Sequence, residues 1–269
     1  MNSKQVIAVT SGRGGVGKTN VAVNLALGLA DLGRRVVLLD GDLAMPNVHI
    51  LLGLTTNSSL VDIVTGKFPI DNVLSSARRG LRVVSGSQGG AYISQLSSVQ
   101  HADIVYSFSE VANSLDFLII DTASGIGNSV LSFIHASHEV LIVVCDEPTS
   151  INDACALIRL LSTRYGVFKF NVLVNMTRTQ SEGAEVFNKM VSITDGFLSV
   201  VLRYLGSIPF DFSVRKATQM HQAVYEAFPD SKCAFAYKLI TEKIDRWPSY
   251  SVSNAHIKFF SDHVPEIEC

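Results

Sequence analysis

The sequence lacks any apolar run close to the roughly 20 residues that a helix needs to cross a bilayer. It also lacks an excess of either charge, because 22 lysines and arginines stand against 24 aspartates and glutamates. This balance argues against broad, indiscriminate binding to nucleic acid, and we expect no direct nucleic-acid contact. Residues 1–4 lead straight into a strand-like run rather than a signal peptide. We therefore expect a cytoplasmic protein, at most peripheral at the inner membrane or cell pole.

The sequence has no C-x-x-C pair among its cysteines. They are scattered along the chain, at Cys145, Cys155, Cys233 and Cys269. Such spacing is typical of reduced thiols, and we expect three of them to fill apolar space. It argues against a zinc or iron–sulfur site contributed by one chain.

Strand-like and helical segments alternate over nearly the whole sequence. With 269 residues, 47% of them hydrophobic, the chain can bury the core of one large α/β domain. The alternation predicts a mostly parallel, twisted sheet with helices on both faces. We place strands at 5–10, 36–39, 81–85, 117–121, 140–144, 170–175 and 204–208. We place helices at 18–32, 99–115, 213–227 and 232–246, and a peripheral helix and loop at 57–80.

The first strand is followed by Gly12-Arg13-Gly14-Gly15-Val16-Gly17-Lys18-Thr19, which fits the phosphate-binding loop G-x-x-x-x-G-K-[ST]. In such a loop, converging backbone amides and a helix N-terminus hold a phosphate group. Lys18 is then expected to reach the terminal phosphates, and the Thr19 hydroxyl to ligate Mg²⁺. The predicted nucleotide contacts of the loop are Gly12, Gly14, Gly15, Val16, Gly17, Lys18, Thr19 and Asn20.

The same glycines also satisfy the dinucleotide fingerprint G-x-G-x-x-G, with Asp40 where a ribose-binding acid belongs. That alternative requires neither the Lys-Thr pair nor Asp42, two residues after Asp40. It also leaves unexplained a later strand that ends in Asp121. Carboxylates at strand ends are what a metal–nucleotide site needs to hold Mg²⁺ and its waters. The combined spacing therefore favours a nucleoside triphosphate.

Two polar segments at strand ends allow a structural and a functional interpretation. Thr149 or Ser150 is expected to cap the helix after strand 140–144, with Asp153 as a capping-box acid, or to face the nucleotide. Asn175 ends the strand 170–175, where its amide is suited to reading the adenine edge or to capping a loop.

A linker-like segment, 248–253, separates residues 1–247 from the end of the chain. Beyond it, Ile257, Phe260 and Val264 form an apolar stripe at helical spacing, bordered by both charges. This stripe within 254–264 predicts a short amphipathic helix that either touches a membrane surface or packs back onto the domain.

With these residues in place, the sequence from residue 4 to about 247 resembles the deviant P-loop ATPases of the MinD/ParA class. Longer strings are similar to the flagellar-number regulators FlhG and FleN, namely 17–21, 143–150, 213–217 and 223–229. The resemblance implies that Asp40 and Asp121 support the metal with Thr19, that Lys18 holds phosphate and that Asp42 positions the attacking water. It also implies an adenine pocket made by Asn175 with the backbone near Pro209, Phe210 and Asp211.

The family normally carries a lysine at the second loop position, which reaches across an ATP-dependent homodimer. This sequence has Arg13 there, which keeps the charge but has a planar fork. We expect Arg13 to act catalytically with dimerisation intact and the hydrolysis rate changed. Some FlhG proteins also act on the GTPase FlhF through an N-terminal D-Q-A-x-x-L-R motif. The absence of that motif here argues against activation by that route.

The resemblance implies a slow, Mg²⁺-dependent ATPase that dimerises with ATP and restrains a FleQ-like transcription activator, and so regulates flagellar number. A ParA- or MinD-like positioning ATPase acting on DNA or membrane is the alternative. A nitrogenase-iron-protein-like electron carrier shares the loop, but it needs paired cluster cysteines that this sequence does not obviously supply.

Overall fold

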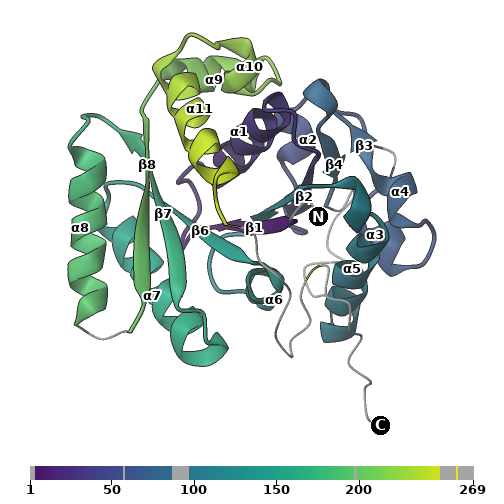
Figure 1. Cartoon of the computed structure of the whole chain (residues 1–269), viewed down its shortest axis with the longest axis horizontal. Coiled ribbons are helices and arrows are strands. Elements are labelled where there is room, and N and C mark those ends of the chain that lie inside the picture. Colours follow the sequence, from purple (N-terminus) through teal and green to yellow (C-terminus); the bar gives the residue numbers. More distant parts are fainter. Residues whose placement is uncertain (1–3, 57, 87–96, 197–198, 249–258, 260–269) are drawn as a thin grey trace.

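The centre of the molecule is an eight-stranded sheet with the order β3-β4-β2-β5-β1-β6-β7-β8 (Figure 1). The computed structural model describes residues 4–56, 58–86, 97–196, 199–248 and 259. Neighbouring strands are parallel except β3 and β4, which are antiparallel. The strands are β1 (Gln5–Thr10), β2 (Val36–Gly41), β3 (Ser75–Ser76), β4 (Arg82–Val84), β5 (Phe117–Thr122), β6 (Glu139–Val144), β7 (Lys169–Thr177) and β8 (Val201–Pro209).

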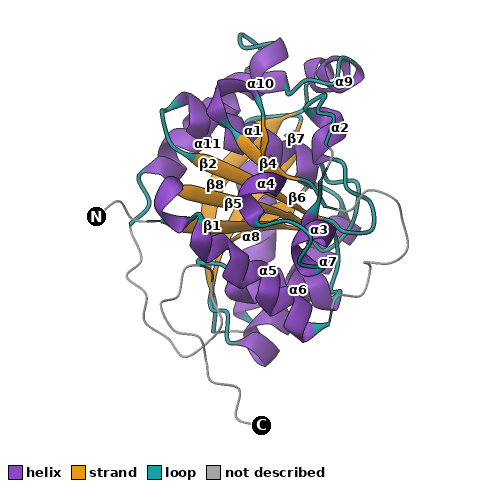
Figure 2. Ribbon diagram, turned by 90° about the vertical axis from the view of Figure 1, so that its right-hand side faces the viewer, coloured by secondary structure: helices purple, strands orange, loops and turns teal. Residues whose placement is uncertain are grey.

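Helices cover both faces of this sheet, as Figure 2 shows. Ile7 and Val9 of β1 pack with α1 and α11 on one side, whereas Val6 belongs to the core under α5. Continuous apolar strands are expected for a sheet buried on both faces, so the predicted fold class is confirmed. The helices are α1 (Lys18–Asp31), α2 (Val48–Leu51), α3 (Leu60–Val64), α4 (Ile70–Val73), α5 (Ser98–Glu110), α6 (Asn128–Ala136), α7 (Pro148–Tyr165), α8 (Glu182–Asp195), α9 (Phe212–Gln219), α10 (Val224–Ala227) and α11 (Lys232–Asp245).

The register of the sheet brings together side chains that are distant in the sequence. On β2 and β5, Asp40 lies opposite Asp121 at the carboxyl ends of two adjacent strands. β1 lies between β5 and β6, so the loop that follows it opens at the same edge. That edge is where parallel α/β sheets bind ligands.

The predicted single helix over 213–227 is wrong. The structure has α9 and α10 there, separated by a turn in which His221 adopts a left-handed backbone with φ 53°. No glycine or proline marks this break in the sequence. The segment 57–80 forms α3, α4, β3 and a 3₁₀ turn rather than one helix and a loop.

The end of the chain returns to the domain at one described residue. Phe259 is fully buried, and its backbone N–H donates to the Ala136 carbonyl at 3.2 Å. The rest of the predicted helix in 254–264 lies outside the described residues. At the proposed boundary near 247, the Gln5 side chain donates to the carbonyls of Trp247 and Pro248 at 3.1 and 3.2 Å.

Within the described ranges, no helix has both the length and the apolar character needed to cross a bilayer. Three of the cysteines, Cys145, Cys155 and Cys233, are buried as free thiols, and Cys269 lies outside the described residues.

Candidate nucleotide site

The loop between β1 and α1 has the backbone geometry of a phosphate cradle. Gly15 and Gly17 have φ values of 86° and 82°, a left-handed conformation that costs glycine little. Gly17 is the N-cap of α1, and no side chain caps this helix end. The backbone N–H groups of the first turn of α1 therefore remain available to a ligand, and the helix dipole favours an anion at this end.

Lys18 and Asp121 form the buried ion pair of the site. Lys18 Nζ lies 2.7 Å from Asp121 Oδ1, and the two side chains are 9% and 1% exposed. Burial raises the pKa of Asp121, while the ammonium of Lys18 and a hydrogen bond from the Thr19 side chain oppose that rise. Lys18, Thr19 and Asp121, to which the sequence assigns phosphate and metal contacts, thus lie together in the structure.

Asp40 is the second buried carboxylate. Its Oδ2 accepts the Val48 N–H at 3.0 Å and its Oδ1 accepts the Asp42 N–H at 3.3 Å. Burial, and then the charge of Asp121, raise the pKa of Asp40 to about 8. When Asp40 is ionised, two buried carboxylates beside one ammonium leave negative charge that a divalent cation would offset. With the Thr19 hydroxyl they form a hard oxygen donor set that fits Mg²⁺, whose remaining ligands would be phosphate and water.

Asp42 lies at the edge of this cluster rather than inside it. Its Oδ1 accepts the Met45 N–H at 3.1 Å, and the residue is only partly buried. It lines a cavity of about 670 Å³ whose opposite wall is the segment after Asp121, including Ser124 and Gly127. Asp42 therefore borders an open space between the segments that follow β2 and β5.

A separate cavity of about 340 Å³ lies beside the start of α1 and collects the predicted adenine contacts. The Asn175 amide nitrogen donates to the Val16 carbonyl at 2.8 Å, so the side chain is fixed against the phosphate loop. Asp211 lines the cavity, but its carboxylate accepts the Ser213 N–H at 2.8 Å and caps α9. The lining is Gly17, Asn20, Asn175, Met176, Ile208, Pro209, Phe210, Asp211, Phe212, Val214, Arg215 and Tyr237.

Met176 is a lining residue that sequence reasoning missed. It lies in an irregular stretch of β7 with φ 60°, unusual for a residue other than glycine. A Cβ added to Gly17 would lie 3.3 Å from its Cε, so the methionine packs onto the phosphate loop. No turn signal precedes it in the sequence, and only the paired strands reveal the bulge.

Arg13 points away from the carboxylates. Its guanidinium hydrogen-bonds the Thr149 hydroxyl and lies 3.6 Å from Glu147 Oε2. It lines a cavity of about 480 Å³ with Gly14, Gly15 and Val16 on one wall. The structure therefore does not bring Arg13 together with Lys18 and Asp42 within one protomer.

The predicted capping of α7 is wrong. The helix begins at Pro148 with Glu147 as N-cap, and no side chain caps it. Proline favours the first helical position, so Pro148 itself indicates where the helix begins. Ser150 Oγ instead accepts the Cys145 N–H at 3.2 Å.

A glycine loop opening a buried helix, a lysine paired with a carboxylate and a second carboxylate one strand away define a P-loop nucleotide-binding protein. Residues 2–245 match the ParA family, described as NUBPL iron-transfer P-loop NTPase, and the chain belongs to that family. P-loop NTPases of this family are ATPases, and so is this chain.

Two curated relatives are named as flagellar proteins. The chain is 51% identical over 264 residues to the antiactivator FleN of Pseudomonas aeruginosa, covering 98% of this chain and 94% of that protein. It is 30% identical to the flagellum site-determining protein YlxH of Helicobacter pylori, covering 75% of this chain and 68% of that protein. Among solved structures, MinD of Aquifex aeolicus aligns with a TM-score of 0.74 at 23% identity, over 93% of this chain and 100% of that one.

A further solved structure contains a nucleotide and a metal. MinD from Pyrococcus horikoshii, in complex with Mg-ADP, aligns with a TM-score of 0.72 at 21% identity, over 90% of this chain and 96% of that chain. The nucleotide and the magnesium belong to that protein, and the alignment to this chain shows the shared fold.

Proposed function

We propose that this protein is a Mg²⁺-dependent ATPase switch that dimerises with ATP and regulates flagellar number by restraining a FleQ-like enhancer-binding transcription activator. The observation that carries the proposal is the buried Lys18–Asp121 pair, with Asp40 on the adjacent strand at the phosphate loop. The 51% identity to the antiactivator FleN over 98% of the chain supports the regulatory role.

The proposed roles follow from where each side chain lies. The Lys18 ammonium and the amides of the loop bind phosphate, and Thr19, Asp40 and Asp121 hold Mg²⁺. Bound magnesium supplies positive charge at the phosphate oxygens. Asp42, at the open cavity, orients water for attack on the terminal phosphate. Asn175, whose amide nitrogen is taken by Val16, directs its remaining oxygen toward the amino group of adenine.

The proposed dimer closes over the face that carries the phosphate loop. Two exposed apolar side chains, Met45 and Ile126, lie in the segments that follow Asp42 and Asp121. The second segment is tied to the loop, because the Gly125 N–H donates to the Ser11 carbonyl at 3.0 Å. A phosphate that moves these segments would therefore change the surface a second protomer meets. Arg13 lies on the same loop and is the proposed contact to the partner's nucleotide.

The proposal is tested by measuring molecular size by light scattering with and without Mg-ATP. The wild type is expected to change from monomer to dimer. Lys18→Ala is expected to stay monomeric because it loses nucleotide affinity. Asp42→Ala is expected to bind ATP, to lose at least about 100-fold in hydrolysis and to remain dimeric, because the water is no longer oriented.

Two outcomes would contradict these assignments. Unchanged ATP affinity in Lys18→Ala would remove the phosphate loop from nucleotide binding. Hydrolysis at the wild-type rate in Asp42→Ala would remove Asp42 from its role. Arg13→Lys is the conservative variant at the second loop position, because it keeps the positive charge and restores the ammonium group that is usual in the family.

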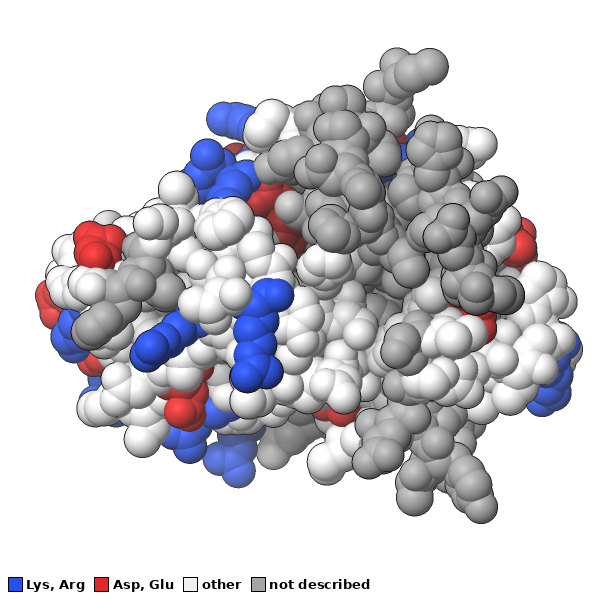
Figure 3. Space-filling view, turned by 90° about the horizontal axis from the view of Figure 1, so that it is seen from below, with Lys and Arg blue, Asp and Glu red and all other residues white. Residues whose placement is uncertain are grey.

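The proposal extends to the location of the protein and to its further partners. We propose a cytoplasmic protein that visits the inner membrane or cell pole, with weak membrane contact through the residues of 254–264 other than Phe259, and with FlhF as a further partner. The alternative is a ParA- or MinD-like positioning ATPase. In Figure 3, basic and acidic side chains are interspersed on the described part of the face in view, which gives no support to a DNA-positioning role. Salt-dependent retention of DNA, or liposome binding lost with residues 254–269, would favour the alternative.

A further inference from the structure

Helix α9 ends in a hydrogen-bonded turn with an unusual residue at its key position. The Gln222 N–H donates to the Ala217 carbonyl and the His221 N–H to the Thr218 carbonyl, both at 3.0 Å. This is the Schellman arrangement, in which the left-handed residue is most often glycine and sometimes asparagine. Here it is His221, with φ 53°. A histidine in this conformation is strained, and the strain calls for a compensating contact.

The compensating contact is a hydrogen bond to α2. His221 Nδ1 lies 3.1 Å from the Ile50 carbonyl oxygen, and because a carbonyl only accepts, the ring nitrogen donates. The same carbonyl accepts the Gly53 N–H at 3.2 Å, in the turn that ends α2. A Cβ on Gly53 would lie 3.1 Å from the His221 carbonyl oxygen, so the two helix ends meet backbone to backbone.

The other end of α2 holds a metal-site carboxylate. Val48 is the first residue of this four-residue helix, and its N–H donates to Asp40 Oδ2 at 3.0 Å. A single helical turn has little stability of its own and depends on tertiary contacts at its ends. The position of the Val48 amide, and with it the orientation of Asp40, therefore depends on the core packing of Val48 and Leu51 and on the contact made at Ile50.

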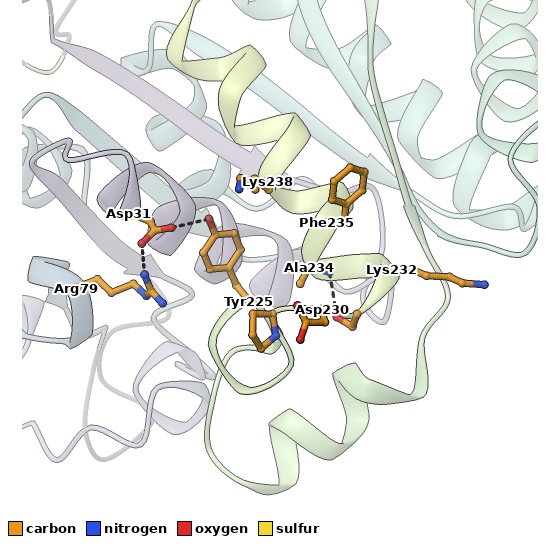
Figure 4. Close-up of a pocket in the computed structure, with 10 residues that line it drawn as sticks. Asp31, Arg79, Tyr225, Asp230, Lys232, Ala234, Phe235 and Lys238 are labelled. Carbon is orange, nitrogen blue, oxygen red and sulfur yellow. Dashed lines mark hydrogen bonds and ion pairs between the residues drawn. The ribbon is translucent and has the colours of Figure 1, made fainter.

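The turn that carries His221 is itself firmly attached to α1. The Tyr225 N–H donates to Asn24 Oδ1 at 2.9 Å and its hydroxyl donates to Asp31 Oδ2 at 3.1 Å. Arg79 pairs with Asp31 and lies 3.5 Å from Glu226. Figure 4 shows Arg79, Asp31 and Tyr225 joined in this way. The beginning of α9 meanwhile lines the cavity proposed for the base. His221 thus projects from a fixed support toward a short, marginal helix.

We propose that His221 is a positioning residue for the metal site: its hydrogen bond to Ile50 holds α2 so that the Val48 amide keeps Asp40 oriented for Mg²⁺. The inference rests on the proposed function as a Mg²⁺-dependent ATPase. It links the segment that lines the base cavity to the carboxylate at the metal, through one helical turn.

Two substitutions separate the side-chain bond from the backbone conformation. His221→Asn tolerates the left-handed backbone and places an amide donor near the position of Nδ1. His221→Gly also tolerates that backbone but has no donor. Gly53→Ala disturbs the same junction from the side of α2. Gly66→Ala is its control, because Gly66 has φ 67° and no atom of the described residues lies within 4 Å of an added Cβ.

The first readout is hydrogen exchange of the amides 48–54 in nucleotide-free protein. The second is the Mg²⁺ concentration that gives half of the full increase in affinity for a fluorescent ATP analogue. His221→Gly and Gly53→Ala are expected to raise the exchange rate and the required Mg²⁺ by about threefold to fivefold, the equivalent of one exposed hydrogen bond. His221→Asn and Gly66→Ala are expected to match the wild type, and metal-free nucleotide affinity to stay unchanged in all four.

Wild-type exchange at 48–54 and a wild-type Mg²⁺ requirement in His221→Gly would overturn the proposal. Equal losses in His221→Asn and His221→Gly would also overturn it, since the backbone rather than the donor would then matter. A wild type whose ATP affinity ignores Mg²⁺ would defeat the proposed function instead. The exchange experiment would still decide whether His221 holds α2.

Discussion

Asp40 is a side chain whose acid–base behaviour departs far from that of a free residue. Its pKa is raised from 3.8 to about 8, first by burial and then by the charge of Asp121. Between these values the folded protein keeps a proton that the unfolded chain has lost. The free energy of unfolding therefore falls as pH rises from about 4 to about 8, by on the order of 5 kcal/mol in total.

Asp40→Asn should remove this pH dependence, because the amide keeps an acceptor for Val48 but does not ionise. In nucleotide-free protein, we expect the stability of the wild type to fall relative to the variant from pH 7 to pH 8, by up to about 1.4 kcal/mol per pH unit. Urea unfolding at the two pH values measures the difference. This window lies above the usual pKa of histidine, and so avoids His101, whose pKa is lowered by burial. Parallel pH profiles would show that Asp40 is already ionised at pH 7.

At the scale of elements, the phosphate loop is supported by a helix that begins more than a hundred residues later. A Cβ added to Gly12 would lie 2.3 Å from the backbone carbon of Asp153 in α7. No real side chain fits there, so the loop rests directly on the helix backbone. At Gly14 the nearest atom to an added Cβ is Ser124 Oγ, at an ordinary 3.6 Å.

Gly12→Ala is accordingly expected to push the loop off α7, to destabilise the protein by about 2 kcal/mol or more and to weaken ATP binding. Gly14→Ala is the matched control and is expected to melt within about 0.5 kcal/mol of the wild type. Thermal unfolding without nucleotide compares the two. Equal melting temperatures would mean that α7 yields to the added methyl group.

The elements divide sharply into those that sequence patterns predict and those that they do not. Apolar runs ending in Asp40 and Asp121 predict both the strands and the edge at which the carboxylates meet, because strand burial follows directly from hydrophobicity. The break at His221 and the bulge at Met176 carry no such signal. Both depend on contacts with distant elements that hold a non-glycine residue in a left-handed conformation.

The site divides in the same way. The phosphate loop follows from local spacing, and Asn175 and residues 209–211, which line the cavity proposed for the base, follow from the family resemblance. The direction in which Arg13 points cannot be predicted from the sequence, because only the folded sheet brings its partners Thr149 and Glu147 near it. The bond from Val48 to Asp40 is likewise a product of tertiary structure, because it involves a backbone amide that any residue supplies.

For the molecule as a whole, the end of the chain is part of the core at Phe259. Its ring lies 5.5 Å from the ring of Phe108, at 82° between the planes. Of the two interpretations of this tail, packing against the domain describes Phe259. Membrane contact by the remaining residues of 254–264 stays a prediction.

Phe259→Ala is expected to cost about 3 kcal/mol of unfolding free energy, because it empties a buried aromatic site. Phe235→Ala is the control, since that side chain is 61% exposed on α11 and its loss should cost no more than about 0.5 kcal/mol. Urea unfolding monitored by circular dichroism measures both. A cost for Phe259→Ala no larger than that of the control would mean that the tail contributes nothing to the stability of the domain.

The order of strands in the sheet has a consequence for synthesis on the ribosome. β1 is made first, yet both its neighbours, β5 and β6, emerge only after residue 116. A nascent chain that has just released the glycine loop therefore has no sheet to hold it and presents neither Asp40 nor Asp121 of the proposed metal site. Nucleotide is expected to find a binding pocket only late in translation, so a prematurely terminated product shorter than about half the chain would not compete with the finished protein for ATP.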